Sequence, residues 1–324
     1  MCFSIKKRLR MHRCVSARWA FRAVVLVVAM SSSALGATVI GGFTKPVAIA
    51  LDGQGYAYVA DEAGYVRKVD LAAPAIVAAL GSPGSGDGQF DQPHDVALDG
   101  NGDLVVVDRG NNRLVVMTTA GQFVRNVPLA GKQPLRVSKW TDGSLLVLEF
   151  APGDLLYVER FDTSYHSLGS WVASQPCSLR SMPSFEADMA IDAAGAIWVA
   201  EHLGCGEEYR LRKYSVDGAL QGNWSRVAGQ LSPETLANAH YAVGLIADLF
   251  TAGNEVYVIL GAGGAESGGL EVDVWTTSGQ YERRSALVGP ARPWVRAVAD
   301  SGWLYIVDPG GTNNLIKLQL SALQ

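Results

Sequence analysis

The sequence is poor in cysteine, in long helical patterns and, over most of its length, in basic side chains. Only 4 of its 324 residues are cysteine, and two of these fall within the first 37 residues, so a disulfide-rich scaffold is excluded. Segments with sustained helical periodicity are few, whereas 36 glycines and a hydrophobic content of 48% suit an all-β domain with many turns.

Charge is distributed unevenly along the chain. Seven of the 27 Lys and Arg residues lie in residues 1–37, which contain no acidic residue, so residues 38–324 carry 20 basic and 31 acidic side chains. The resulting net charge of −11 for residues 38–324 disfavours binding to a phosphate backbone. We therefore expect no nucleic-acid partner.

Residues 1–37 have the composition of a secretory signal peptide. A basic segment precedes an apolar run over residues 23–30, and small residues follow at 31–37. The apolar run is too short to span a bilayer comfortably. We expect cleavage near Ala34, Gly36 or Ala37, a secreted or periplasmic monomer, and no stable membrane insertion afterwards. The alternative is an uncleaved membrane anchor.

Residues 88–117 contain three short apolar runs separated by turn residues. The breaks fall at residues 99–102 (DGNG) and 109–112 (RGNN), where Gly and Asn tolerate positive φ. This pattern predicts three antiparallel strands in a meander. A lone meander cannot bury both of its faces, so copies of it are expected elsewhere in the chain.

Similar units recur at intervals of about 45 to 60 residues, the period of propeller blades. The six units begin near Pro46, Pro93, Pro134, Asp188, Leu245 and Pro293. The first five units have a fourth apolar run, and residues 39–43 can supply the one that the sixth lacks. The sequence therefore predicts one all-β domain over residues 38–324. Its fold is a six-bladed β-propeller of four-stranded antiparallel blades, closed by an N-terminal strand that completes the last blade.

The second unit resembles the NHL repeat of bacterial exported β-propellers. The resemblance rests on GQF at 88–90, PHDVALD at 93–99, Gly102, VD at 107–108 and NNRL at 111–114. It implies six four-stranded blades around a central channel. It implies less about function, because this scaffold serves both binding proteins and enzymes.

Extra chain is concentrated on one expected face of the propeller. The connections between units at 81–92, 173–186 and 228–244 are long, and so are the loops at 202–208 and 261–269 after the second strands. Long loops on a rigid scaffold often carry binding sites. We therefore expect a binding or scaffolding module that uses this face for a protein, peptide or glycan. The alternative is a metal-dependent lyase or hydrolase with a site at the channel mouth.

Several polar side chains and one tryptophan are expected around the channel mouth on that face. They are His94, Asp95, Arg109, Arg136, Asp188, His202, His240 and Trp294. They could form a polar pocket for a small ligand or a peptide end. They could equally form a ring of ion pairs and water that satisfies itself.

Two sets of residues raise the question of a metal. A distant similarity to the propeller of peptidylglycine α-amidating lyases, which use three histidines around zinc, implies a zinc site at His94, His202 and His240. The other interpretation is three ordinary loop histidines, and we expect no cofactor. Acidic residues also end the second strands, where they either bind a cation such as calcium or accept backbone N–H bonds. These acids are Asp61, Asp108, Glu149, Glu201 and Asp308. Their recurrence in five units favours the structural role.

Cys177 and Cys205 are the cysteines that remain after cleavage. Both fall on the loop-rich face of one unit, so a disulfide between them is expected after export, with two buried thiols as the alternative. No nucleophile elbow or phosphate-binding loop is present, and the glycine-rich segment 261–269 follows a strand without opening a helix.

Overall fold

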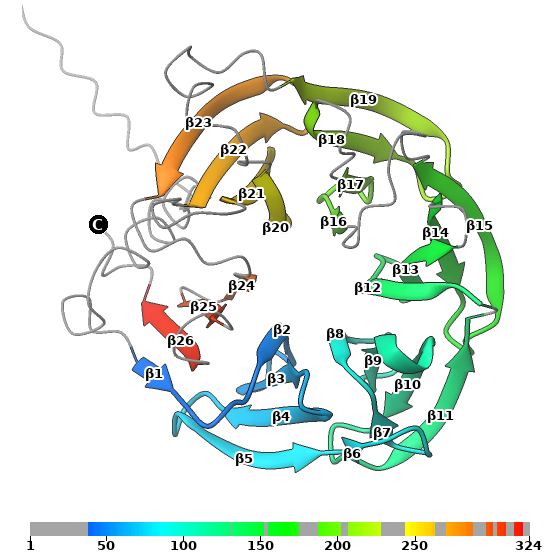
Figure 1. The fold of residues 1–324 in the computed structure, drawn as a ribbon, viewed down its shortest axis with the longest axis vertical. Helices are drawn as coiled ribbons and strands as arrows, with labels where there is room; N and C mark the ends of the chain where they lie inside the picture. The colour runs from blue at the N-terminus through cyan, green and yellow to red at the C-terminus, as the bar shows by residue number, and fades with distance from the viewer. Residues whose placement is uncertain are drawn as a thin grey trace, which may run out of the picture.

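The computed structural model describes residues 38–129, 131–151, 155–174, 187–201, 207–227, 244–262, 270–287, 296–300, 303–308 and 314–319. Six four-stranded antiparallel sheets surround a central axis, as Figure 1 shows. The predicted six-bladed propeller is therefore confirmed.

The blades follow one another in chain order, and in each of the first five the first strand lies innermost. Blade 1 contains β2 (Pro46–Leu51), β3 (Tyr56–Asp61), β4 (Tyr65–Asp70) and β5 (Ala75–Leu80). Blade 2 contains β8 (Pro93–Leu98), β9 (Leu104–Asp108), β10 (Arg113–Met117) and β11 (Phe123–Pro128). Blade 3 contains β12 (Gln133–Lys139), β13 (Leu145–Ala151), β14 (Leu155–Phe161) and β15 (Ser167–Ser174).

The remaining blades repeat this arrangement. Blade 4 contains β16 (Ala187–Ile191), β17 (Ile197–Glu201), β18 (Glu207–Tyr214) and β19 (Leu220–Val227). Blade 5 contains β20 (Gly244–Ala252), β21 (Glu255–Ala262), β22 (Leu270–Thr276) and β23 (Tyr281–Leu287). Blade 6 contains β24 (Arg296–Asp300), β25 (Trp303–Asp308) and β26 (Asn314–Gln319), and its outer strand is β1 (Thr38–Ile40).

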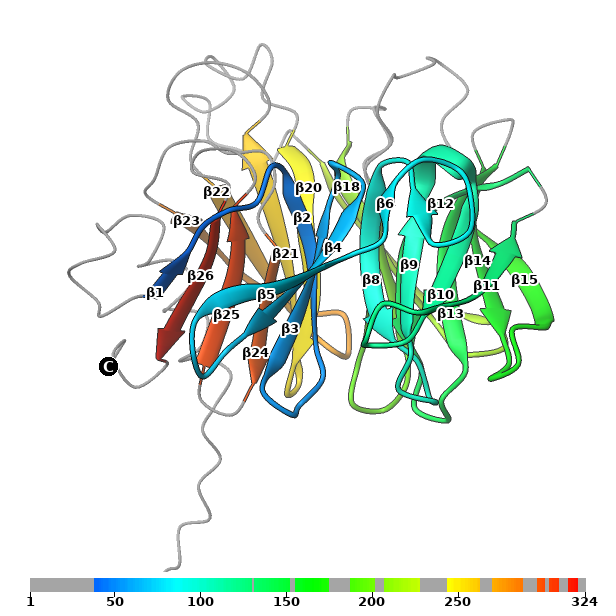
Figure 2. The same cartoon turned by 90° about the horizontal axis from the view of Figure 1, so that it is seen from below.

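The two ends of the propeller meet in blade 6. Strand β1 pairs antiparallel with β26, with Val39 opposite Ile316, and the two strands lie side by side in Figure 2. Behind this pair, Ile40 packs in a buried cluster with Val307 and Leu315. The N-terminal strand thus completes the last blade as predicted, which removes two open sheet edges.

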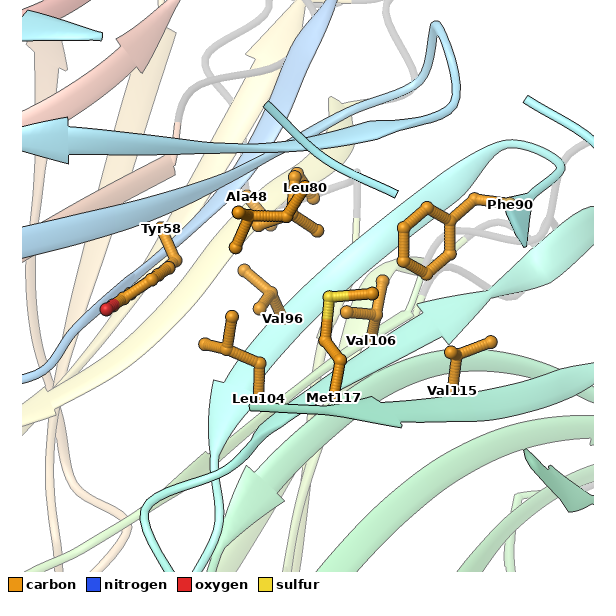
Figure 3. Close-up of a cluster of buried hydrophobic side chains, with 11 residues drawn as sticks. Ala48, Tyr58, Leu80, Phe90, Val96, Leu104, Val106, Val115 and Met117 are labelled. Atoms are coloured by element: carbon orange, nitrogen blue, oxygen red, sulfur yellow. The ribbon is translucent and has the colours of Figure 1, made fainter. Parts of the chain in front are cut away.

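The core lies between neighbouring blades. Figure 3 shows one such cluster, in which Tyr58 of blade 1 lies near Val96, Leu104 and Met117 of blade 2. Each sheet has two apolar faces and can bury both only against its neighbours. The stability of every blade therefore depends on the blades beside it.

Aspartate residues shape the turns between the first and second strands. Asp99 Oδ1 accepts hydrogen bonds from the N–H groups of Asn101 and Asp103, both at 2.8 Å. Asp192 repeats this arrangement in blade 4, with Ala194 and Ala196 as donors. A side chain that bonds to its own turn fixes the loop without needing a tertiary partner.

A short parallel pair links blades 1 and 2 and was not predicted from the sequence. Strand β6 (Ser82–Pro83) pairs with β7 (Gln89–Phe90) at the upper end of Figure 2. Gly81 precedes it with φ of 75°, and a Cβ there would lie 2.2 Å from the Phe90 ring. Glycine is therefore required where the buried Phe90 side chain crosses the chain.

In the described part of the chain, no helix is long and apolar enough to cross a membrane.

Candidate functional site

The innermost strands of the six blades surround a cavity along the propeller axis. Its volume is about 420 Å³, and side chains from β2, β8, β12, β16, β20 and β24 line it. Figure 1 shows these strands around the centre of the molecule. The cavity is within the size range of small-ligand sites, about 300–1,000 Å³.

One position recurs near the start of every inner strand and lines this cavity. In each blade it lies opposite the residue that comes just before the predicted acid of the second strand, as Asp95 lies opposite Val107, or just before Leu260 in blade 5. A register shift lies immediately before this position in blades 1, 2, 3 and 5. We call this set the channel ring, and its members are Ala48, Asp95, Arg136, Asp188, Asp248 and Arg296.

Asp188 is the electrostatic centre of the channel ring. Its Oδ1 accepts a hydrogen bond from Arg136 Nε at 2.9 Å, and its Oδ2 pairs with Arg296 Nη1. The same Arg296 nitrogen pairs with Asp248 Oδ1. Burial raises the pKa of Asp188, but the two guanidinium groups and its hydrogen bonds outweigh that effect and hold the pKa below its usual value. Blades 3, 4, 5 and 6 are thereby joined at the channel.

Two ring aspartates also satisfy the backbone of the next blade. Asp95 Oδ2 accepts from the N–H of Val137 at 2.9 Å, and Asp188 Oδ2 accepts from the N–H of Leu249 at 2.8 Å. An inner strand leaves backbone groups unpaired on its channel side. These carboxylates satisfy two of those groups, so part of the ring has a structural role.

Asp95 differs from Asp188 in its electrostatic surroundings. Burial raises its pKa, and Arg136 and Arg296 act against that rise from a distance. Among the described residues no cation lies within ion-pair distance of Asp95; both of these arginines pair with other aspartates. Asp95 is therefore the ring carboxyl with the least compensated charge.

His94 adjoins the ring but turns toward blade 1. Its Nδ1 lies 3.5 Å from Glu62 Oε1, and Glu62 also pairs with Lys45. Burial lowers the pKa of His94 to about 4, against the effect of Glu62 and with help from Arg136, Arg109 and Arg296. The imidazole is therefore neutral at physiological pH and could act as a hydrogen-bond donor or a base.

Arg109 extends from blade 2 toward blade 3, whereas His94 faces Glu62 of blade 1. It begins the 3-10 turn η2 (Arg109–Asn111), and its Nη2 lies 3.5 Å from Gln133 Oε1 in blade 3. Burial lowers its pKa, opposed by the charge of Glu62. The structure thus brings Asp95, Arg136 and Asp188 together and places His94 and Arg109 beside them.

The other predicted residues lie outside the described part of the chain. They are His202, His240 and Trp294 of the expected channel mouth, and Cys177 and Cys205 of the expected disulfide. The zinc site expected from the resemblance includes two of these histidines. Within the described ranges, no group of three or more His, Cys, Asp or Glu side chains is arranged to hold a metal ion.

The acids at the ends of the second strands serve their own blades. We call Asp61, Asp108, Glu149 and Glu201 the strand-end acids. Asp61 accepts from the N–H groups of Thr44 and Lys45, each at 2.9 Å, and Asp108 accepts from that of Asp91 at 2.7 Å. The predicted structural role is therefore confirmed for these two aspartates.

Each of the two glutamates among the strand-end acids forms an ion pair. Glu149 pairs with Lys132 and Glu201 pairs with Arg212, both at 2.9 Å. Burial raises the pKa of Glu149 to about 7, although Lys132 opposes the rise. The side chain of Asp308, the fifth predicted acid, is outside the described residues.

Comparison with a family model identifies one of the six units. Residues 90–117 match the NHL repeat. The chain contains an NHL repeat. This NHL repeat includes His94, Asp95 and Arg109, so three of the predicted channel-mouth residues lie within it.

Similar solved structures share the fold at low sequence identity. Virginiamycin B lyase from Staphylococcus aureus is 11% identical with a TM-score of 0.53, and the match covers 87% of this chain and 98% of the lyase. A gluconolactonase from Xanthomonas campestris is 15% identical with a TM-score of 0.55, and the match covers 86% of each chain. No curated protein matches this chain. Identities this low establish the fold alone.

Sequence reasoning missed Asp248 and Arg296, which complete the channel ring. Arg296 lies four residues before Asp300, as Asp95 lies four residues before Asp99, so aligning the units on that aspartate would have found it. Asp248 gave a weaker signal because the fifth unit has Leu260 in place of a strand-end acid. The NHL repeat itself contributes Asp95 to the ring.

Proposed function

We propose that this protein is an exported propeller that binds a protein, peptide or glycan by taking a polar group of that ligand into the mouth of its central channel. The observation that carries this proposal is the channel ring. Five of its six members are charged, yet the blade 1 position is Ala48. A blade can thus be built with a methyl group there, so the fold does not require a charge at each position.

The cavity supports the same conclusion. It opens among charged side chains of blades 2 to 6 and continues past apolar ones such as Leu51 and Ile191. A cavity that combines several convergent polar groups with apolar walls is typical of ligand recognition. The signal-like leader and the acidic body favour an envelope or extracellular ligand over nucleic acid.

A second candidate is an enzyme at the same mouth, a lyase or a hydrolase. One observation favours it: the imidazole of His94 is neutral, so it can accept a proton, and it lies beside the Glu62 carboxylate, although a pKa of about 4 makes it a weak base. Among similar folds, a catalytically inactive histidine-to-alanine variant of virginiamycin B lyase from Staphylococcus aureus has been solved with quinupristin; it is 12% identical with a TM-score of 0.51, and the match covers 87% of this chain and 98% of the lyase. A metal-dependent form of this function would need zinc or calcium held partly by residues such as His202 and His240.

Retention of ligands from envelope extract tests the binding function. The mature protein would be immobilised and compared with Asp95→Asn and with Val77→Asp, which adds a charge on the exposed outer strand of blade 1. We expect a ligand retained by wild type and Val77→Asp and lost from Asp95→Asn. Equal retention by all three would contradict the channel-mouth site.

Elemental analysis of the same preparation separates the two candidates. Stoichiometric zinc or calcium, lost from a His94→Gln variant, would favour the enzyme. A metal content that is low and unchanged in the variant would favour the binding module.

A further inference from the structure

The channel ring is interrupted at blade 1. Ala48 contributes only a methyl group to the cavity, while the neighbouring blades contribute Asp95 and Arg296. Inner strand β2 of blade 1 contacts both β8 of blade 2 and β24 of blade 6. Ala48 itself is 2% exposed and packs in a buried cluster with Tyr58 and Val96. The ring therefore has a gap in its charges at blade 1, where a methyl group bounds the cavity between a blade that presents an acid and a blade that presents a base.

Asp95 and Arg296 influence each other across this gap without forming an ion pair. Arg296 opposes the rise in the pKa of Asp95 that burial causes. Among the described residues, however, the ion pairs of Arg296 go to Asp188 and Asp248. A group placed between Asp95 and Arg296 would therefore not have to break an existing ion pair.

Both residues keep unused hydrogen-bonding capacity. Arg296 Nη1 serves the two aspartates, while its Nη2 is buried and has no partner among the described residues. Asp95 accepts one backbone N–H on each oxygen, from Val96 and Val137. A carboxylate accepts about four hydrogen bonds, so Asp95 can still accept from a ligand while Arg296 donates to it.

The charge balance of the ring favours a neutral ligand. Its three aspartates outnumber its two arginines, and both arginines are already paired. A ligand carboxylate would be repelled by the excess aspartates and would find both guanidinium groups already paired. A ligand ammonium group would be repelled by the two arginines. A hydroxyl group can donate to Asp95 and accept from Arg296 at once, with no added charge to desolvate.

We propose that the gap at Ala48 binds a neutral sugar residue, whose adjacent hydroxyl groups donate to Asp95 and accept from Arg296 Nη2. This inference rests on the proposed function and selects a glycan among its three ligand classes. Ala48 then determines specificity because a larger or charged side chain would occupy the place of the sugar.

Calorimetric titration of the full mature protein tests this site. The probes are galactose, glucose and N-acetylglucosamine, with galacturonate as the acidic counterpart of galactose. We expect at least one neutral sugar to bind and galacturonate to bind at least tenfold more weakly than galactose. The Ala48→Asp substitution should lower the affinity for the neutral sugar at least tenfold. The Val77→Asp variant should bind the sugar with wild-type affinity. Absence of neutral-sugar binding, or equal affinity in Ala48→Asp, would overturn the proposal.

A second variant guards against misfolding of Ala48→Asp. Asp95→Asn keeps the shape of the side chain but loses its charge, so the affinity should fall by about tenfold. Unchanged affinity would overturn the role of Asp95. If no sugar binds, but wild type binds a peptide or protein that neither variant binds, the sugar class is wrong and the proposed function stands. If no ligand depends on the ring, both fail.

Discussion

The channel ring and the strand-end acids both repeat around the propeller, but they differ in what they contact. Asp61 bonds to backbone close to its own blade, and Asp108 does the same with help from Asn111 and Arg113. Asp188 instead joins Arg136 and Arg296 from other blades. The strand-end position is acidic in four described blades, whereas the ring position is Ala, Asp or Arg. A position with the same residue type in most blades has a structural role within each blade. A position whose residue type varies between blades is available for a function of the whole ring.

The largest effect is expected from Asp188→Ala. Its removal leaves Arg136 and Arg296 buried without their shared partner and the N–H of Leu249 unbonded. Breaking a buried pair in this way costs about 3–5 kcal/mol of the free energy of unfolding. Urea denaturation measures this loss. A change below about 1 kcal/mol would show that the ring does not join the blades.

A smaller loss is expected from Asp108→Ala. The variant loses a hydrogen bond from the N–H of Asp91 and the ion pair with Arg113, while Arg113 keeps the carbonyls of Gly86 and Gln89 as acceptors. We expect the free energy of unfolding to fall by about 2–3 kcal/mol, as is typical for the loss of hydrogen bonds to a charged group. Ligand binding should be unchanged. Weaker ligand binding in this variant would contradict the assignment of a structural role to the strand-end acids and of a binding role to the channel ring.

Glu149 offers a test by pH. Its pKa is about 7 in the folded protein against 4.5 ordinarily, because burial outweighs Lys132. The folded state therefore disfavours ionisation, and this carboxyl costs stability as the pH rises from 4.5 through 7. Relative to Glu149→Gln, the wild type should lose about 2–3 kcal/mol between pH 4.5 and 8, measured by urea denaturation at each pH.

Glu159→Gln is the matched control for that experiment. Burial alone would raise the pKa of Glu159, but Lys132 and Ser167 hold it below its usual value. Its contribution is therefore present above pH 4.5 and is lost as the pH falls. Opposite pH trends for the two glutamine variants support this electrostatic account, and parallel trends would contradict it.

His94 gives the most local readout, since only the titration of its own ring is followed. Its pKa of about 4 lies below the ordinary value of about 6.5, so the neutral form is favoured in the folded state and stability is lost as the pH falls through 6.5 toward 4. Nuclear magnetic resonance should show a His94 ring signal, identified with His94→Gln, that does not titrate above pH 5. A pKa near 6.5 would contradict the burial of His94 that lowers its pKa in the folded protein.

The fold could be predicted because several sequence signals agree. Turn residues such as those at 99–102, alternating apolar runs and an unpaired N-terminal strand all indicate the same closed ring. The positions of Asp95, Arg136 and Asp188 near the mouth followed from the start of each inner strand.

The partners within the ring could not be predicted in the same way. Arg136 and Asp188 are 52 residues apart, and Arg296 reaches Asp188 across the channel from blade 6. No local pattern specifies which blade an inward-facing arginine will contact. The gap at Ala48 likewise becomes visible only when its neighbours from blades 2 and 6 are placed beside it.

The most direct test of the account compares one variant from each set for ligand affinity. Calorimetry with the best-bound neutral sugar would be done on wild type, Asp95→Asn of the channel ring and Asp61→Asn of the strand-end acids, at a temperature where all three are folded. The account predicts about a tenfold loss of affinity in Asp95→Asn and none in Asp61→Asn. Equal affinities in all three proteins, or equal losses in both variants, would contradict it.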